Sequence, residues 1–141
     1  MKKENLFGYV PAIATPFNKK GEIMEDAFVD LFEFLIERGA TCVCIAGDNG
    51  ESWSLSAEER GRLVRVAKDT SRGRVPIMMG ISAPTIDASL SYIRAAEENG
   101  ADVLLSMPQT YVLKASDAEL MARFDKVSEA TNKPLVLYNS P

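Results

Sequence analysis

The chain has 141 residues, of which 46% are hydrophobic and 26% charged, a globular composition that excludes a disordered tail. Sixteen basic and twenty acidic residues give a net charge of -4 without a strong basic cluster, so we expect no nucleic-acid partner. No apolar run approaches the roughly 20 residues that span a bilayer, and the N-terminus lacks the apolar stretch of a signal peptide, so we expect no membrane partner and a cytoplasmic location.

Five short apolar runs predict β-strands. They read YVPAIA from Tyr9, CVCIA from Cys42, VPIMMG from Val75, VLLSM from Val103 and LVLYN from Leu135. Between them, apolar residues recur at helical spacing: Phe28, Leu31, Phe32, Leu35 and Ile36, then Leu63, Val64 and Ala67, then Leu90, Ile93 and Ala96, and then Leu120, Phe124 and Val127. Strand and helix are therefore expected to alternate along the whole chain.

Local signals mark where the helices begin and end. Two pairs have the spacing of a capping box: Ser56 with Glu59, and Ser116 with Glu119. Gly39 and Gly100 follow the first and third expected helices, where glycine allows the chain to turn toward the next strand.

The order βαβαβαβαβ predicts an α/β fold with a parallel sheet covered by helices. Leu135–Leu137, behind a proline at the end of the chain, reads as a strand buried on both faces. Two architectures fit this pattern: a complete flavodoxin-like open sheet, or part of a (β/α)8 barrel, which needs about 250 residues. Sequence pattern alone leaves both open.

Cys42 and Cys44 are interpreted as core residues. Two positions apart in an apolar run, they are expected on opposite faces of a strand, where they could not easily bridge each other or share a metal. The chain has no histidine, so we expect no metal site, and no nucleotide fingerprint or other motif implies a cofactor.

The loops after the strands carry the candidate chemistry, because they form the functional face of a parallel α/β fold. They read ATPF, GDNGES, GISAPT, MPQTY and YNSP. Gly47 and Gly50 would let the backbone bend around a carboxylate or phosphate, although a plain turn before a capped helix is the preferred interpretation of these residues by themselves. Trp53 is interpreted as packing at the helix start rather than as a ligand platform.

Several motifs in register resemble the first part of the dihydrodipicolinate synthase and N-acetylneuraminate lyase family. They are PAIATPFNKKGEI, GDNGESWSLSAEER, PIMMGISAPT, GADVLLSMP and KPLVLYNSP, in this order from about Tyr9 to Pro141. The resemblance implies a (β/α)8 TIM barrel, of which residues 1–141 would be the N-terminal portion of a single domain: about the first four βα units plus strand five, truncated before strand six.

The resemblance also implies a homo-oligomer, a dimer or tetramer, and a lysine that forms a Schiff base with pyruvate or a related 2-keto acid. The family carries this lysine on the sixth strand. None of the lysines of this chain falls inside a predicted strand: Lys2, Lys3, Lys19, Lys20, Lys68, Lys114, Lys126 and Lys133. We therefore expect this chain to be inactive by itself.

The resemblance assigns roles to five residues. Tyr138 matches the family tyrosine that carries protons during Schiff-base formation, and Tyr111 is the nearest candidate for a tyrosine that crosses a dimer interface into the partner's site. Asp48 and Asn49 occupy the two threonine positions of a Gly-Thr-Thr-Gly-Glu loop that binds the substrate carboxylate, and Thr15 is assigned to the same pocket. Asp48 departs from the family pattern, since an anion there would repel a carboxylate.

The expected activity is formation or cleavage of a carbon–carbon bond by a 2-keto-acid-dependent lyase or synthase similar to dihydrodipicolinate synthase. A sialic-acid or sugar-acid aldolase or dehydratase of the same family is the close alternative. An alternative of another class is a catalytically inactive half-barrel that serves as an assembly or binding module.

Overall fold

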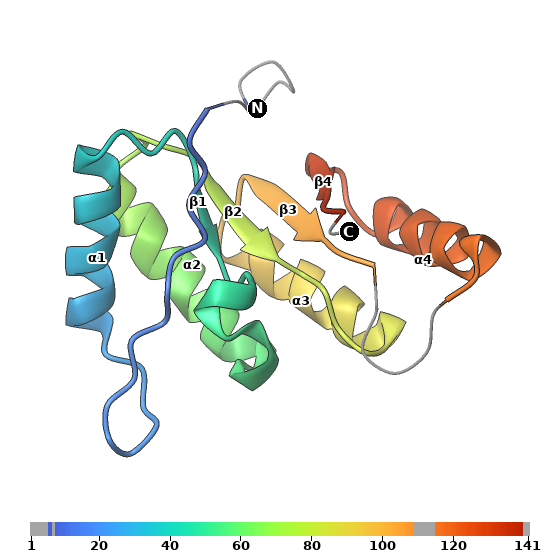
Figure 1. Ribbon diagram of the computed structural model, residues 1–141, viewed down its shortest axis with the longest axis horizontal. Coiled ribbons are helices and arrows are strands. Elements are labelled where there is room, and N and C mark those ends of the chain that lie inside the picture. Colours follow the sequence, from blue (N-terminus) through green and yellow to red (C-terminus); the bar gives the residue numbers. More distant parts are fainter. Residues whose placement is uncertain (1–5, 7, 109–114, 140–141) are drawn as a thin grey trace.

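A computed structural model describes residues 6, 8–108 and 115–139 (Figure 1). From α1 on, its helices and strands alternate in the predicted order. The elements are α1 (Glu25–Glu37), β1 (Val43–Ile45), the 3-10 turns η2 (Asp48–Gly50) and η3 (Ser52–Ser54), α2 (Ala57–Ser71), β2 (Ile77–Gly80), α3 (Ile86–Glu98), β3 (Val103–Ser106), α4 (Asp117–Glu129) and β4 (Leu135–Leu137).

The helix boundaries follow the predicted local signals. Both capping boxes form, with Ser56 accepting the Glu59 amide at the start of α2 and Ser116 accepting the Glu119 amide at the start of α4. Gly39, after α1, has a φ of 88°, which a residue with a side chain rarely adopts. The structure confirms these local predictions. They could be made from the sequence because each one depends on residues only a few positions apart.

The four strands form one parallel sheet in the order β1-β2-β3-β4. The pairing places Cys44 beside Met78, Met79 beside Leu104, and Leu105 beside Val136. The strands therefore follow one another across the sheet in the same order as along the chain.

The first predicted strand, in segment 9–14, is present only as a single bridge on the free edge of β1. Ala12 pairs with Cys44, and the Ile13 amide donates to the Cys44 carbonyl at 3.0 Å. The Cys44 amide in turn donates to the carbonyl of Pro11 at 2.9 Å. Because proline has no amide hydrogen, Pro11 cannot donate to a longer ladder, which explains why no regular strand forms.

The two faces of the sheet have different cores. One face packs against helices, in a cluster that includes Phe28 and Phe32 of α1, Leu63 of α2 and Ile93 of α3. The described residues of the other cluster include none from a helix: Cys42, Cys44, Met78 and Val103, with Leu6, Ala12, Leu105 and Val136 packed against them.

Sequential strand order with helices on one face is the arrangement of part of a (β/α)8 barrel, whose inner face carries the cluster around Met78. A flavodoxin-like sheet instead reverses its strand order and carries helices on both faces. The chain therefore has the α/β fold of part of a (β/α)8 barrel, and the open-sheet alternative is wrong.

β4 corrects one prediction. The stretch Leu135–Leu137 was expected to be buried on both faces, yet Leu135 and Val136 are half-buried and Leu137 is 54% exposed. The reason is that, among the described residues, β4 pairs only with β3 and forms the edge of the sheet.

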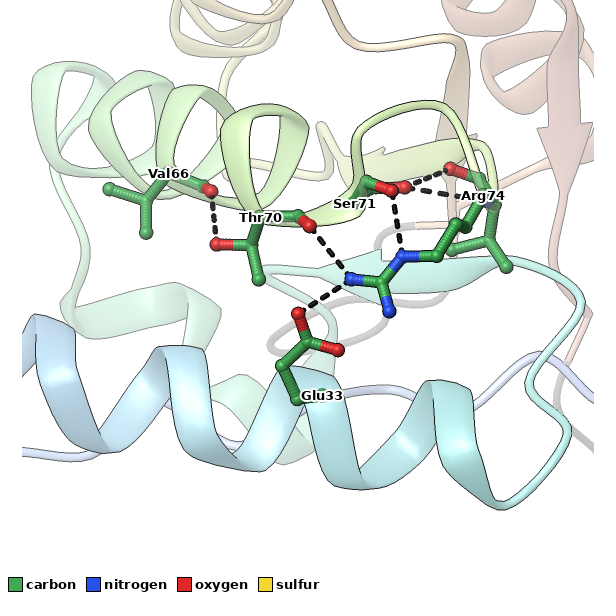
Figure 2. A network of polar contacts seen from close by, with 6 residues as sticks. Glu33, Val66, Thr70, Ser71 and Arg74 are labelled. Atoms are coloured by element: carbon green, nitrogen blue, oxygen red, sulfur yellow. Dashed lines mark hydrogen bonds and ion pairs between the residues drawn. The ribbon is translucent and has the colours of Figure 1, made fainter.

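Polar contacts hold the C-terminal end of α2 to its neighbours (Figure 2). The Arg74 guanidinium donates to Glu33 of α1 at 2.5 Å and to the carbonyls of Thr70 and Ser71, so it caps α2 and joins it to α1. Lys68 of α2 pairs with Asp102, just before β3, at 3.0 Å, and the Ile77 amide donates to Asp102 at 2.8 Å. No helix in the described part of the chain is long and apolar enough to cross a membrane.

Candidate functional site

The loop after β1 brings the predicted pocket residues to the carboxyl end of the sheet. Gly47 precedes the 3-10 turn of Asp48, Asn49 and Gly50, whose last amide donates back to the Gly47 carbonyl at 3.0 Å. The side chains of Asp48 and Asn49 are exposed, whereas Gly50 is buried. A Cβ on Gly50 would stand 2.8 Å from the Ile13 carbonyl oxygen, so this turn requires glycine to lie against the first segment.

Thr15 supports this turn from the neighbouring segment. It is 6% exposed, and its hydroxyl donates to the Gly50 carbonyl at 2.8 Å. Because that hydroxyl is used to hold the loop, Thr15 fixes the position of the residues before Gly50. Its assignment as a direct substrate ligand stays a prediction.

Tyr138 reaches the same region from the opposite edge of the sheet. It follows β4 directly, and its amide donates to the Ser106 carbonyl at 2.9 Å, which continues the pairing with β3. The residue is 49% exposed. A backbone held by the sheet with a side chain open to solvent suits a group that must meet a ligand.

A cavity of about 200 Å³ joins these residues, although they lie 90 positions apart in the sequence. It is lined by Ala12, Cys44, Gly47, Asp48, Asn49, Leu105, Met107 and Tyr138. A second, largely apolar cavity of about 300 Å³ lies along the inner face of the sheet, and Ala12, Cys44, Leu105 and Tyr138 border both. Three predicted site residues, Asp48, Asn49 and Tyr138, therefore share one cavity. Tyr111 lies outside the described residues.

The cavity combines one carboxylate, one amide and one phenol with apolar walls. Its lining includes no lysine, and the described lysines all lie outside the strands. The arrangement can accept and donate hydrogen bonds through its polar groups, while its apolar residues offer contact to a ligand's carbon atoms.

The two cysteines correct a second prediction. Cys42 and Cys44 lie in the same inner-face cluster, not on opposite faces, because side chains two positions apart on a strand point the same way. Both thiols are free and buried. Burial raises the pKa of Cys42 to about 11, with a smaller contribution from Asp102, and that of Cys44 to about 12, with smaller contributions from Cys42 and then Asp48.

Sequence reasoning missed two residues that support the site loop, Arg60 and Gly80. Arg60 is 1% exposed, although arginine is rarely buried without an acidic partner, so nothing in the sequence marked it. Gly80 ends β2 where an apolar run meets a glycine, a pattern that signals close approach of another backbone. Trp53, expected to pack at the helix start, is instead 69% exposed.

Comparison with known proteins agrees with this geometry. A sequence model of the dihydrodipicolinate synthetase family matches residues 5–141. The 4-hydroxy-tetrahydrodipicolinate synthase of Salinibacter ruber is 36% identical over 142 residues, covering 100% of this chain and 47% of that protein. The corresponding synthase of Methanocaldococcus jannaschii is 37% identical over 134 residues, covering 95% and 46%. The chain thus spans about half the length of the curated relatives it matches.

Solved structures give the same coverage. Dihydrodipicolinate synthase from Agrobacterium tumefaciens superposes with a TM-score of 0.89 at 33% identity, over 98% of this chain and 46% of that one. YagE from E. coli K12, solved in complex with pyruvate, gives 0.88 at 29% identity over 96% and 45%. N-acetylneuraminate lyase from Mycoplasma synoviae gives 0.88 over 99% and 48%, but at 24% identity it shows a shared fold alone.

Proposed function

Since this chain belongs to the dihydrodipicolinate synthetase family, we propose that it is the N-terminal portion of a lyase or synthase that activates pyruvate or a related 2-keto acid as a Schiff base. Residues 1–141 would then be the first half of a single barrel domain. The observation that carries this proposal is the cavity that Asp48, Asn49 and Tyr138 share at the carboxyl ends of β1 and β4. Active sites of such barrels are built from these loops.

Tyr138 would act as the proton carrier. A lysine amine adds to the 2-keto carbonyl to give a carbinolamine, which loses water to form the imine, and the departing hydroxyl must gain a proton. The Tyr138 hydroxyl can supply that proton and regain one from water, because its side chain lines the cavity and is half-exposed. The lysine itself would come from a part of the protein outside residues 1–141.

Asp48 and Asn49 would receive the substrate. The Asn49 side-chain amide can donate to a carboxylate, whereas the Asp48 carboxylate favours a hydroxyl or amino donor over a second carboxylate. This difference supports a sugar-acid aldolase or dehydratase as the second candidate, since its substrates carry several hydroxyl groups. A homo-oligomer completes the proposal, as the family resemblance implies.

Borohydride trapping tests the proposal on the protein that carries this chain. Incubation with pyruvate and borohydride should add the mass of one reduced pyruvate to the intact protein, and peptide mapping should locate it on a lysine. Lactate, which has no carbonyl, serves as the control. An unmodified mass would contradict the Schiff-base proposal and favour the non-catalytic binding module.

A further inference from the structure

Arg60, near the start of α2, is a buried cation without an acidic partner among the described residues. Its guanidinium donates to the Gly80 carbonyl at 2.7 Å, to the Leu55 carbonyl at 3.4 Å and to the Ser52 carbonyl. Its Cζ lies 3.8 Å from the centre of the Tyr92 ring. Three backbone carbonyls and one aromatic face therefore take the place of a carboxylate.

These carbonyls belong to the two segments that frame the site loop. Ser52 and Leu55 bracket the η3 turn, which follows the turn of Asp48 and Asn49 after a single residue. Gly80 ends the neighbouring strand β2. Arg60 thus connects the far end of the site loop to the strand beside it.

The near end of the loop meets the same strand end. A Cβ added to Gly80 would stand 2.0 Å from the Ala46 carbonyl oxygen, so the two backbones are in direct contact. Ala46 has a φ of 52°, and Glu51, between the two turns, has a φ of 53°. A loop with two residues in the left-handed region needs outside contacts to hold its shape, and both of its ends are held at Gly80.

Arginine suits this position better than any other side chain. Its planar fork spreads five N–H donors over three nitrogen atoms, whereas the three donors of a lysine all radiate from one nitrogen. Burial lowers the pKa of Arg60, and the Tyr92 side chain opposes that change. A cation is costly to bury, so the contacts it makes with the loop must offset that cost.

We propose that Arg60 is a positioning residue that fixes the loop from Ala46 to Leu55, and with it Asp48 and Asn49, against the end of β2. Binding of a substrate by Asp48 and Asn49 rests on the proposed function. The positioning of the loop by Arg60 does not rest on it, so an experiment can contradict either claim without the other.

The single tryptophan of the chain supplies a local probe. Trp53 lies in η3, between the carbonyls that Arg60 holds, and its side chain is 69% exposed. Time-resolved fluorescence anisotropy separates motion of Trp53 on the nanosecond timescale from tumbling of the whole particle. The measurement needs no substrate.

The variants are Arg60→Met, which keeps an unbranched stem but removes every donor, and Arg60→Lys, which keeps the charge but loses the fork. Arg65→Met is the matched control, because Arg65 is exposed on the same helix and makes one side-chain bond, to Asn99 at 3.3 Å. All proteins are compared well below their melting temperatures.

We expect the fast component of the Trp53 anisotropy decay to grow in Arg60→Met, to be intermediate in Arg60→Lys and to stay at the wild-type amplitude in Arg65→Met. A lower melting temperature alone, with an unchanged Trp53 decay in the folded Arg60 variants, would overturn the proposal and leave Arg60 as a contributor to stability only. If Arg60→Met does not fold, Arg60→Lys decides the question by the same measurement.

Discussion

Gly80 and Ala46 are in direct backbone contact, and a methyl group on Gly80 would stand 2.0 Å from the Ala46 carbonyl oxygen. That distance is far below van der Waals contact, and the obstacle is backbone rather than a flexible side chain. The end of β2 and the start of the site loop can therefore approach only because residue 80 has no side chain.

Gly80→Ala should destabilise the protein by at least about 3 kcal/mol, the upper end of the usual cost of overpacking. Denaturant unfolding would measure the change. Gly39→Ala is the matched control: a Cβ there would meet nothing within 4 Å, but the φ of 88° should still cost about 1–2 kcal/mol. Equal losses in the two variants would show that conformational strain, not the contact with Ala46, dominates at Gly80.

Asp48→Thr should strengthen binding of pyruvate in the protein that carries the Schiff-base lysine. Removing a repulsion of about 1 kcal/mol between two charges near solvent corresponds to about fivefold in the dissociation constant. Calorimetric titration with pyruvate would check this. Asp69→Thr, on the exposed side of α2, makes the same change of net charge away from the cavity and should leave the affinity unaltered. Unchanged or weaker binding in Asp48→Thr would mean that Asp48 does not face the carboxylate.

In the protein that carries the Schiff-base lysine, Tyr138→Phe should lower kcat by about a hundredfold or more while the fold stays intact, because a general acid–base group typically contributes 10² to 10⁴. Tyr9→Phe is the control, since Tyr9 is 52% exposed and does not line either cavity. Steady-state kinetics and circular dichroism would be compared for both variants. Near-normal turnover in Tyr138→Phe would remove this residue from the mechanism.

The buried thiols should make stability depend on pH under alkaline conditions. An unfolded cysteine has a pKa near 9, whereas burial raises the folded values to about 11 for Cys42 and about 12 for Cys44. The folded state therefore retains the thiol protons more tightly. The stability that the protonated thiols contribute to the folded state is therefore fully present below pH 9, and it is lost as the pH rises toward 11 to 12.

The unfolding free energy should thus fall across this range more steeply in the wild type than in a Cys42→Ala, Cys44→Ala double variant. Urea unfolding at a series of pH values would compare the two. Parallel pH profiles would contradict the raised pKa values.

Iodoacetamide at pH 8 should likewise label neither thiol until the protein is unfolded.

Residues 1–141 prepared alone should self-associate. The inner face and the β4 edge expose Tyr9, Val10, Leu137 and Tyr138 by 36% to 54%, and an open edge pairs readily with another strand. Light scattering should show a dimer or larger particle. Leu137→Lys, which places a charge on the edge, should reduce the association, and a dilution-resistant wild-type monomer would contradict this prediction.

The sequence by itself determined the described elements from α1 to β4, their order and several helix ends, but not that the segment from Tyr9 would form only a single bridge. Apolar periodicity marked the four helices of the described residues, and the capping boxes at Ser56 and Ser116 formed as predicted. These features depend on residues within a few positions of one another, which the sequence displays directly. The sequence also contained the information that Cys42 and Cys44 share a face, because side chains alternate along a strand with a period of two. The expectation of opposite faces applied that period wrongly.

The sequence motifs also indicated the family, and through it the barrel, which periodicity alone left open. Only the tertiary structure decided which distant groups meet. It placed Asp48, Asn49 and Tyr138 around one cavity. The Thr15 hydroxyl donates to the Gly50 carbonyl. Arg60 is buried against three backbone carbonyls, those of Ser52, Leu55 and Gly80. A buried arginine and an exposed Trp53 contradict the usual preferences of these residue types. Arg60 is buried because the Gly80 carbonyl and the Tyr92 ring, which lie 20 and 32 positions further along the chain, pack against it in the folded protein.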